Sequence, residues 1–264
     1  GEAVVSSKRF NNSLDNAIYI GYTYNSSMVG VTDSTDVNVA FGDNSNYSIV
    51  NTTDSNIKNY IENTWYVENL SNDVYANLLE PSAGYCSDRT AYSNASVLPP
   101  PTEYIIPQQG KNFLYFGSYE RNLVAGSMLS LTCPRGTVDL YSTSLAKDGN
   151  KQLLYPIALL TADEVALAGS GNGGLTSASS NSSNYSYDSY LRTKRYFWLL
   201  SPSYRLDNST APAAFFLQTE GYIRSDWVNY SLSVRPVISL VHSATITSGS
   251  GTATDPWIIS PPES

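Results

Sequence analysis

The chain has 264 residues, 41% of them hydrophobic, and this length and composition suit a globular fold with a substantial core. Only 14% of the residues are charged and the net charge is −8, which excludes nucleic acid as an expected partner, because phosphate recognition needs clustered lysine and arginine. No run of apolar residues is long enough to span a bilayer, so we expect no membrane insertion.

The first quarter of the chain predicts one strand and one helix. Residues 17–22 have the apolar and aromatic composition of a short strand. Residues 54–70 predict a helix, because apolar side chains recur there at every fourth position. These side chains are Ile57, Ile61 and Trp65. Either Thr53 or Asp54 is expected to cap the helix.

A polar loop or hairpin is predicted over residues 32–47, and it carries Asp33, Asp36 and Asp43. Carboxylates together with loop carbonyls could ligate calcium, but the spacing of a helix–loop–helix calcium site is absent. We therefore expect no cofactor, and a structural calcium ion at these aspartates is the alternative.

The two cysteines, Cys86 and Cys133, predict a disulfide. They lie between residues 80 and 150, where prolines and glycines predict long loops. Two cysteines in a chain rich in Asn and Ser are typical of one disulfide in an oxidising compartment, and two buried free thiols are the alternative. The prediction favours an extracellular location.

A second helix is predicted directly after a strand at residues 153–160. Thr161 and Glu164 form the sequence pattern of a capping box, in which each side chain satisfies a free amide at the helix start. Gly169 is expected to end the helix. Residues 169–190 are low-complexity Gly, Ser and Asn, and they predict a long loop.

The last third of the chain alternates apolar segments with polar, aromatic ones. The apolar segments at 196–202, 213–217 and 233–240 are typical of buried strands. Between them, residues 204–210 and 222–231 are rich in the Tyr, Ser, Asn and Arg that antibody loops use for recognition. The chain has 21 tyrosines and 7 phenylalanines, which favours half-exposed aromatic surface, although Tyr is also common in ordinary strands.

These segments together predict a recognition surface on a packed frame. The frame side chains expected to be buried are Trp198, Leu200, Phe215, Leu217, Val237 and Leu240. Arg235 is expected to anchor the last core strand by guanidinium hydrogen bonds, and Pro236 to lie at a strand start or edge. The ligand-binding side chains, expected on one exposed, contiguous face, are Tyr204, Arg205, Asp207, Asn208, Ser209, Tyr222, Arg224, Ser225, Asp226, Trp227, Asn229, Tyr230 and Ser231. Residues 249–259 predict a turn and a short closing strand.

Most groups that would support catalysis are absent from the sequence. The single histidine, His242, makes no triad, and neither cysteine belongs to a Cys-x-x-Cys motif. A glycoside hydrolase would need a pair of carboxylates in a cleft, and Asp207 and Asp226 are the candidates in the polar segments. We expect a binding protein and not an enzyme.

Six short sequence segments, taken in order, resemble those of a known group of proteins. They are Gly84-Tyr-Cys-Ser-Asp-Arg89, Leu131-Thr-Cys-Pro134, residues 154–169, Phe197-Trp-Leu-Leu-Ser-Pro202, Val234-Arg-Pro-Val-Ile-Ser-Leu240 and Gly251-Thr-Ala-Thr-Asp-Pro-Trp257. They resemble prokaryotic and phage surface domains with the C-type lectin fold, in the branch that includes formylglycine-generating-enzyme-like folds. The likeness runs from about residue 17 to residue 259. It implies an α+β fold, a single domain over residues 1–264, with two helices, a small twisted antiparallel sheet and long loops.

One subset of this group, the variable proteins of diversity-generating retroelements, carries hypervariable positions in its C-terminal part. Adenine-specific mutagenesis of Asn-type codons yields there the residue types that fill the two polar segments, so the variable-like part would be about residues 196–240. Trp227 cannot arise from an Asn codon in this way, so it would be a fixed residue. The formylglycine-generating chemistry does not carry over, because Cys86 and Cys133 lack the required context.

The resemblance therefore implies a receptor-binding or ligand-binding domain on a virion or cell surface, with a protein or glycan ligand on a target surface. The alternative is an adhesion or structural module of a phage or cell-surface protein whose binding face is not diversified.

Overall fold

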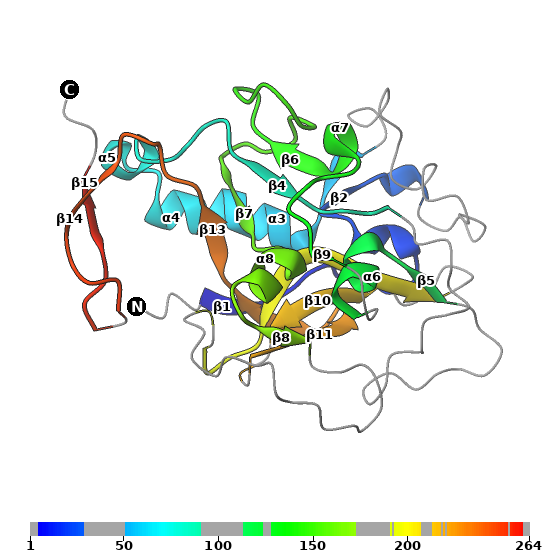
Figure 1. Ribbon diagram of the computed structural model, residues 1–264. Coiled ribbons are helices and arrows are strands. Elements are labelled where there is room, and N and C mark those ends of the chain that lie inside the picture. The colour runs from blue at the N-terminus through cyan, green and yellow to red at the C-terminus, as the bar shows by residue number, and fades with distance from the viewer. Residues whose placement is uncertain are drawn as a thin grey trace.

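The computed structural model describes residues 5–28, 51–90, 113–123, 128–172, 191, 193–206, 213–217, 219, 221–252 and 254–260. They form a mixed fold of helices and sheets, as the expected α+β class requires (Figure 1). The predicted polar loop with Asp33, Asp36 and Asp43 lies outside the described residues, as does most of the predicted loop at 169–190.

The largest sheet among the described residues has seven strands in the order β1-β12-β9-β10-β11-β8, with β5 added beside β9. Its strands are β1 (Val5–Arg9), β12 (Ser231–Val234), β9 (Phe197–Leu206), β10 (Ala213–Leu217), β11 (Tyr222–Trp227), β8 (Gly171–Asn172) and β5 (Phe113–Tyr115). The apolar segments predicted as strands at 196–202 and 213–217 are thus confirmed. The sheet is not purely antiparallel, because β12 runs parallel to β9 and β8 runs parallel to β11.

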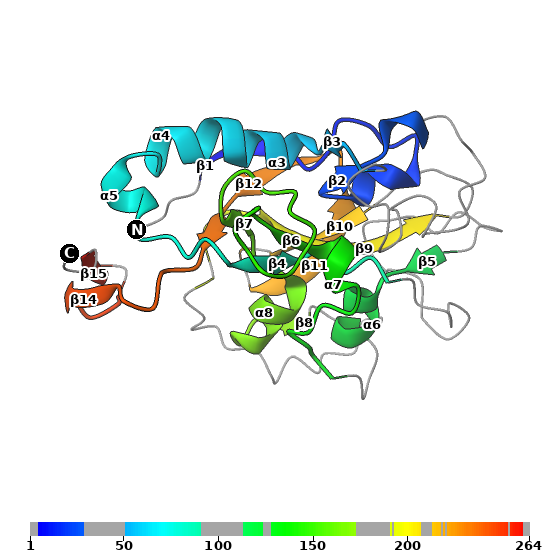
Figure 2. The same cartoon turned by 90° about the horizontal axis from the view of Figure 1, so that it is seen from above.

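Both faces of this sheet are covered. Successive side chains of a strand point to opposite faces, and in β9 both sets are buried from Phe197 to Arg205. Trp198 and Leu200 belong to the larger core, which includes Ile57 and Ile61, whereas Phe197 and Leu199 belong to a second core. In Figure 2 the helical segment 56–69 lies on one side of the sheet, and the helices α6 (Gly117–Leu123) and α8 (Ala162–Leu167) lie on the other.

The first predicted helix is confirmed, with a different cap. It runs through α3 (Asn56–Tyr60), a π-helical segment (Ile61–Tyr66) and α4 (Val67–Asn69). The Ser55 hydroxyl accepts the capping hydrogen bond from the Lys58 amide at 3.2 Å. Residues Thr53–Asp54 instead form strand β3, which pairs with β2 (Thr23–Tyr24). Pairing with a distant strand is therefore what displaces the cap.

The predicted strand at residues 17–22 is wrong. Residues Ala17–Ile20 form a 3-10 helix, because the Asn16 side chain accepts a hydrogen bond from the Ile18 amide and starts a turn. Ile18 and Ile20 are fully buried and cluster with Phe116. A short apolar run does not distinguish a buried turn from a strand, and here the tertiary contact decides.

The second predicted helix is confirmed in detail. The Thr161 hydroxyl accepts a hydrogen bond from the Glu164 amide at 3.1 Å, and the Glu164 carboxylate accepts one from the Thr161 amide at 2.7 Å. Gly169, just after α8, has a φ of 90°, a left-handed conformation that glycine adopts readily.

The strand predicted before α8 is shorter than expected, and its pairing supports the predicted roles of Arg235 and Pro236. Strand β7 (Ile157–Leu159) pairs with β13 (Pro236–Ile238), which starts at the predicted proline. The Arg235 guanidinium donates a hydrogen bond to the Leu191 carbonyl at 2.8 Å, as predicted.

The predicted frame is only partly buried. Trp198 and Leu200 are fully buried, and the Trp198 indole N–H donates to the Lys8 carbonyl at 2.9 Å. Val237 is half-buried, and Leu240 is 37% exposed, so the expectation of burial is wrong for Leu240. Leu240 pairs with Leu79 outside the large sheet. The side chains of Phe215 and Leu217 lie outside what the structure describes.

Short elements replace several of the long loops predicted between residues 80 and 150, and a short helix precedes them. They are α5 (Asp73–Ala76), β4 (Gly84–Cys86), α6, α7 (Gly136–Asp139) and β6 (Leu140–Ser142). A further short element is the 3-10 turn Ser26–Met28. The predicted closing strand is confirmed as β15 (Ile258–Ser260), which pairs with β14 (Thr245–Ser248) away from the large sheet (Figure 1). No helix in the described part of the chain is long and apolar enough to cross a membrane.

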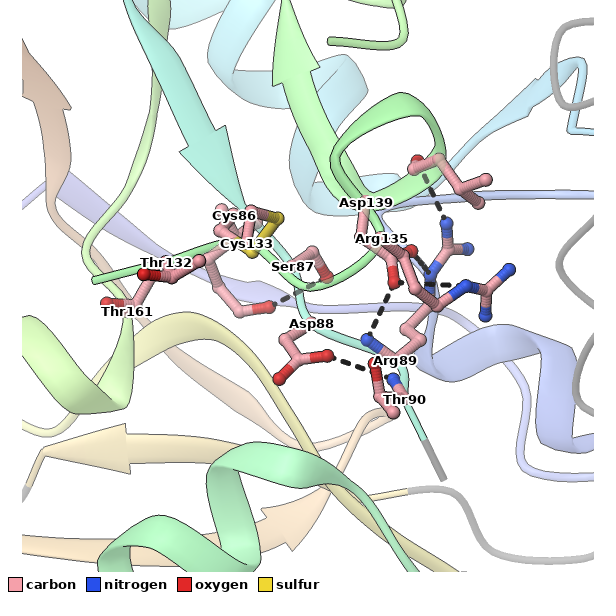
Figure 3. The surroundings of a disulfide bond; sticks show 12 residues. Cys86, Ser87, Asp88, Arg89, Thr90, Thr132, Cys133, Arg135, Asp139 and Thr161 are labelled. Carbon is pink, nitrogen blue, oxygen red and sulfur yellow. Dashed lines mark hydrogen bonds and ion pairs between the residues drawn. A yellow bond between two sulfur atoms is a disulfide. The ribbon is translucent and has the colours of Figure 1, made fainter. Parts of the chain in front are cut away.

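The predicted disulfide is present. Cys86, at the end of β4, is bonded to Cys133 in the segment before α7, with Cα atoms 5.6 Å apart (Figure 3). The bond closes a loop between residues 47 positions apart. The presence of a disulfide fits a protein of an oxidising compartment.

Replacing both cysteines by serine is expected to lower the free energy of unfolding by about 4 kcal/mol, because the open chain gains conformational entropy in the unfolded state. Urea unfolding of the Cys86→Ser/Cys133→Ser variant and the oxidised wild type measures the difference. A loss below about 1 kcal/mol would contradict this role of the bond.

Candidate functional site

The predicted recognition residues of β11 alternate between buried and half-exposed positions. Tyr222, Arg224 and Asp226 are half-buried, whereas Ile223 and Ser225 between them are buried. The Arg224 guanidinium lies 5.9 Å from the centroid of the Tyr222 ring. The buried side chains hold the strand, so its other face presents an aromatic and a cationic group partly to solvent.

Among the described residues of the predicted set, those in the turn after β11 are the most exposed. Tyr230 is 51% exposed, Ser231 is exposed, and Trp227 and Asn229 are half-buried. The Tyr230 amide donates to the Trp227 carbonyl at 3.0 Å and closes the turn. These residues lie where a ligand could reach them.

The expected exposure is wrong for Tyr204, Arg205 and Ser225. Tyr204 is fully buried, and its ring lies 6.0 to 6.3 Å from the rings of Tyr115, Tyr119 and Trp227. Arg205 and Ser225 are also buried. The cause is that β9 continues as far as residue 206 and pairs with β5, while α6 packs beside it. Burial raises the pKa of the Tyr204 hydroxyl well above its ordinary value.

The remaining predicted residues, Asp207, Asn208 and Ser209, lie outside the described residues. The arrangement of Asp207 and Asp226 as the two carboxylates of a glycoside hydrolase therefore stays untested. Asp226 accepts a hydrogen bond from the Trp227 amide at 2.8 Å. Burial raises the pKa of its carboxyl to about 6, although the Trp227 amide partly opposes the shift.

A second candidate site, which the sequence did not predict, is a small polar cavity beside the disulfide. Its volume is about 110 Å³. The lining residues come from β4 and the segment after it, from α6, β6, α8 with its N-cap, and β9, and from the segment that carries Cys133. They are Gly84, Cys86, Asp88, Ser118, Arg121, Ser130, Leu131, Thr132, Leu140, Thr161, Asp163, Glu164 and Ser201.

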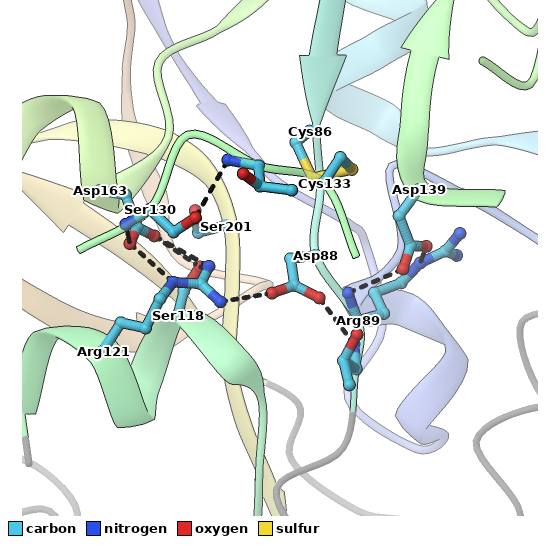
Figure 4. Close-up of polar contacts among 12 residues, drawn as sticks. Cys86, Asp88, Arg89, Ser118, Arg121, Ser130, Cys133, Asp139, Asp163 and Ser201 are labelled. Atoms are coloured by element: carbon cyan, nitrogen blue, oxygen red, sulfur yellow. Dashed lines mark hydrogen bonds and ion pairs between the residues drawn. A yellow bond between two sulfur atoms is a disulfide. The ribbon is translucent and has the colours of Figure 1, made fainter. Parts of the chain in front are cut away.

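Arg121 lines this cavity and lies between two aspartates (Figure 4). Its guanidinium donates two hydrogen bonds to the Asp163 carboxylate, at 2.7 and 3.0 Å, and one to Asp88 at 2.7 Å. Asp163 also accepts from the Ser130 amide at 3.1 Å. Burial alone would lower the pKa of Arg121, but these hydrogen bonds raise it. The arginine thus ties together α6, α8 and the segment after β4.

The close approach of α6 to Asp88 requires a glycine. A Cβ atom added at Gly117 would lie 2.5 Å from an Asp88 carboxylate oxygen, and the Gly117 amide donates to the Thr90 carbonyl at 2.9 Å. The other Asp88 oxygen accepts from the Thr90 amide at 3.0 Å. Asp88 is therefore held by groups on both sides.

A second ion-pair group adjoins the first. Arg89 is fully buried and donates from Nε to the Asp139 carboxylate at 2.7 Å, and its backbone amide donates to the same carboxylate at 3.1 Å. Arg135 lies farther from Asp139, at 3.8 Å. Figure 3 shows these groups beside the disulfide.

The chemistry of this region favours a structural brace. Each aspartate faces an arginine, so the buried charges compensate one another. In the described part of the chain, no three His, Cys, Asp or Glu side chains are grouped to hold a metal ion. The segment Gly84-Tyr-Cys-Ser-Asp-Arg89 contains Asp88 and Arg89, but their ion-pair partners, Arg121 and Asp139, come 33 and 50 residues later in the chain, which sequence spacing does not reveal.

A scan against protein-family models and searches of curated proteins and of solved structures each found no match to this chain.

Substitution of Arg121 by methionine is expected to lower the free energy of unfolding by about 3 to 5 kcal/mol, because it leaves two buried carboxylates without their cation. Arg135→Met is the matched control, since the two arginine side chains are similarly exposed but Asp139 keeps Arg89. The control is expected to lose less than about 1 kcal/mol. Equal losses in urea unfolding would contradict the special role of Arg121.

Asp226→Asn is expected to stabilise the protein at pH 7.5, by up to about 3 kcal/mol, because the folded wild type must keep a half-buried carboxylate ionised. The folded-state pKa of about 6 lies above the ordinary value of 3.8, so the wild type gains stability as the pH falls from about 6 to about 4. The advantage of the variant should therefore vanish near pH 4. Thermal unfolding of both proteins between pH 4 and 8 measures it, and a pH-independent difference would contradict the assignment.

Proposed function

We propose that this chain is a ligand-binding protein whose site is formed by β11 and the turn that follows it. The observation that carries the proposal is the alternation in β11, where Ile223 and Ser225 are buried while Tyr222 and Arg224 are half-exposed. A strand anchored in this way presents side chains without depending on them for its own stability. Tyrosine and arginine are enriched among the residues that dominate binding energies at interfaces.

We further propose the C-type lectin-like scaffold for this site. The proposal rests on the resemblance stated above. Structural features at the sequence segments that carry this resemblance support it. The Cys86–Cys133 bond, the capping box of α8 and the start of β13 at Pro236 all coincide with them. The two parallel strand pairs depart from the small antiparallel sheet that the resemblance implies.

Hypervariability is proposed only for those predicted ligand-binding residues that are exposed or half-exposed. Trp227 packs against the Tyr204 ring at 6.0 Å, which fits a residue that would be fixed. Tyr204 and Arg205 are buried, so replacing them would disturb packing, and they favour the alternative of a module that is not diversified. The presence near the gene of a template repeat that differs only at adenines would distinguish diversification from this alternative.

We propose a virion or cell surface as the location, in keeping with the disulfide. The ligand would then be a protein or glycan on a target surface.

The test is a binding screen with the purified protein on arrays of bacterial and host glycans and of extracellular protein domains. Tyr222→Ala/Tyr230→Ala is expected to weaken binding to the ligands found by about 30-fold or more, because aromatic anchors contribute about 2 kcal/mol or more. Its melting temperature should stay within a few degrees of the wild type.

Tyr75→Ala is the matched control, since Tyr75 is also 51% exposed but lies on α5. Full binding by the double variant, or an equal loss in the control, would refute the proposed site.

A further inference from the structure

Cationic residues gather at one end of the large sheet, where β9 and β11 begin. This is notable because the whole chain has only 15 lysines and arginines and a net charge of −8. The cations from β1, β11 and the segment before β9 are Lys8, Arg9, Lys194, Arg195 and Arg224. None of the ion pairs in the described part of the chain involves Lys8, Arg9, Lys194 or Arg195.

The strand register places these cations beside tyrosines. Leu217 pairs with both Phe197 and Ile223, so the preceding residues, Tyr196 and Tyr222, lie two strands apart at the same end of the sheet, a separation of about 10 Å. On the other side of Tyr196, strand β12 pairs with β9 and carries Leu232, the partner of Lys8. The row from Lys8 to Tyr222 thus crosses five strands and spans about 19 Å.

Aromatic rings and cations lie near one another at this end of the sheet. The Lys8 ammonium lies 4.4 Å from the centroid of the Tyr60 ring, and Arg224 lies over Tyr222. The Tyr196 ring is 40% exposed and lies 5.6 Å from the ring of Phe216. We call the row Lys8, Tyr196, Tyr222 and Arg224, with Lys194 and Arg195, the cationic band.

A closed turn presents the two cations before β9. The Thr193 hydroxyl donates to the Arg195 carbonyl at 2.7 Å and accepts from the Arg195 amide at 3.2 Å. The side chains of Lys194 and Arg195 are exposed. Their charges therefore stand in solvent next to Tyr196, without a role in the core.

We propose that the cationic band binds an acidic polysaccharide, that is, a sugar chain with carboxylate or sulfate groups. This rests on the proposed function, because Tyr222 and Arg224 belong to the same surface. Separated cations suit the spaced charges of such a chain, and exposed tyrosines offer an apolar ring face and a hydroxyl to a sugar ring.

The direction of the band favours a polysaccharide over a peptide. The row runs across the strands and ends at the edge strand β1, so a ligand that follows the row lies over side chains and does not extend the sheet along its edge. Recognition along it must come from side chains. A polyphosphate carries a charge on every unit, so the net charge of −8 repels it more strongly than a polysaccharide whose charges are spaced apart.

The experiment measures binding of three fluorescent dextrans of equal length, namely uncharged dextran, carboxymethyl-dextran and dextran sulfate, by anisotropy at 50 and 300 mM NaCl. We expect binding to one or both charged dextrans, none to the uncharged one, and at least tenfold weaker binding at the higher salt, because salt screens exposed charges. The charged dextran that binds more tightly shows whether the band prefers carboxylate or sulfate groups.

Lys194→Ser/Arg195→Ser is expected to weaken this binding at least fivefold with no change in melting temperature. Lys147→Ser and Arg195→Ser form a matched pair of single changes, since both cations are exposed but Lys147 lies in a distant turn. Only the Arg195 variant should bind more weakly.

Equal binding of uncharged dextran, no effect of the double variant, or tighter binding of a single-stranded oligonucleotide would each overturn the proposal. If the array ligands are lost in the Tyr222→Ala/Tyr230→Ala variant while neither charged dextran binds, the proposed site stands and only the polysaccharide inference fails.

Discussion

The guanidinium of Arg121 holds together three parts of the chain that are far apart in sequence. Its hydrogen bonds to Asp88 and Asp163 join α6, α8 and the segment after β4, and the disulfide at Cys86 secures that same segment from the other side. Because these groups are largely removed from solvent, breaking one contact leaves a charge that neither water nor another cation compensates. This brace places α6 and α8 against one face of the large sheet, and that placement buries Tyr204.

Coverage of both faces determines where the sheet can meet a ligand. The centre of β9 is buried on both sides, so among the described residues from β9 to β12 the partly or fully exposed side chains lie at strand ends, on β11 and in the turn that follows it. Tyr196, Tyr222 and Tyr230 are at such places, and they are also where the protein combines aromatic surface with positive charge. The acidic remainder of the chain would keep the protein soluble and would weaken non-specific binding to nucleic acid. Rigid packing beneath an exposed strand is what allows its side chains to serve recognition.

Local signals in the sequence were sufficient for several elements. The capping box of Thr161 and Glu164 needs only residues three apart, and the glycine after α8 needs only its own backbone freedom. The spacing of four residues between Ile57 and Ile61 predicted the long helix correctly. Two cysteines allowed one pairing, so the disulfide followed from their number and the composition of the chain.

Contacts between distant segments decided the rest. The sequence by itself determined the elements of the α+β class, the disulfide and the apolar strands of the last third, because each depends on neighbours or on simple counting. Only the tertiary structure decided that Tyr204 is buried, since the strand β5 that covers it comes about 90 positions earlier. It likewise decided the partners of Arg121 and the row that brings Lys8 beside Tyr196, because strand register and ion pairing join residues whose separation along the chain carries no signal.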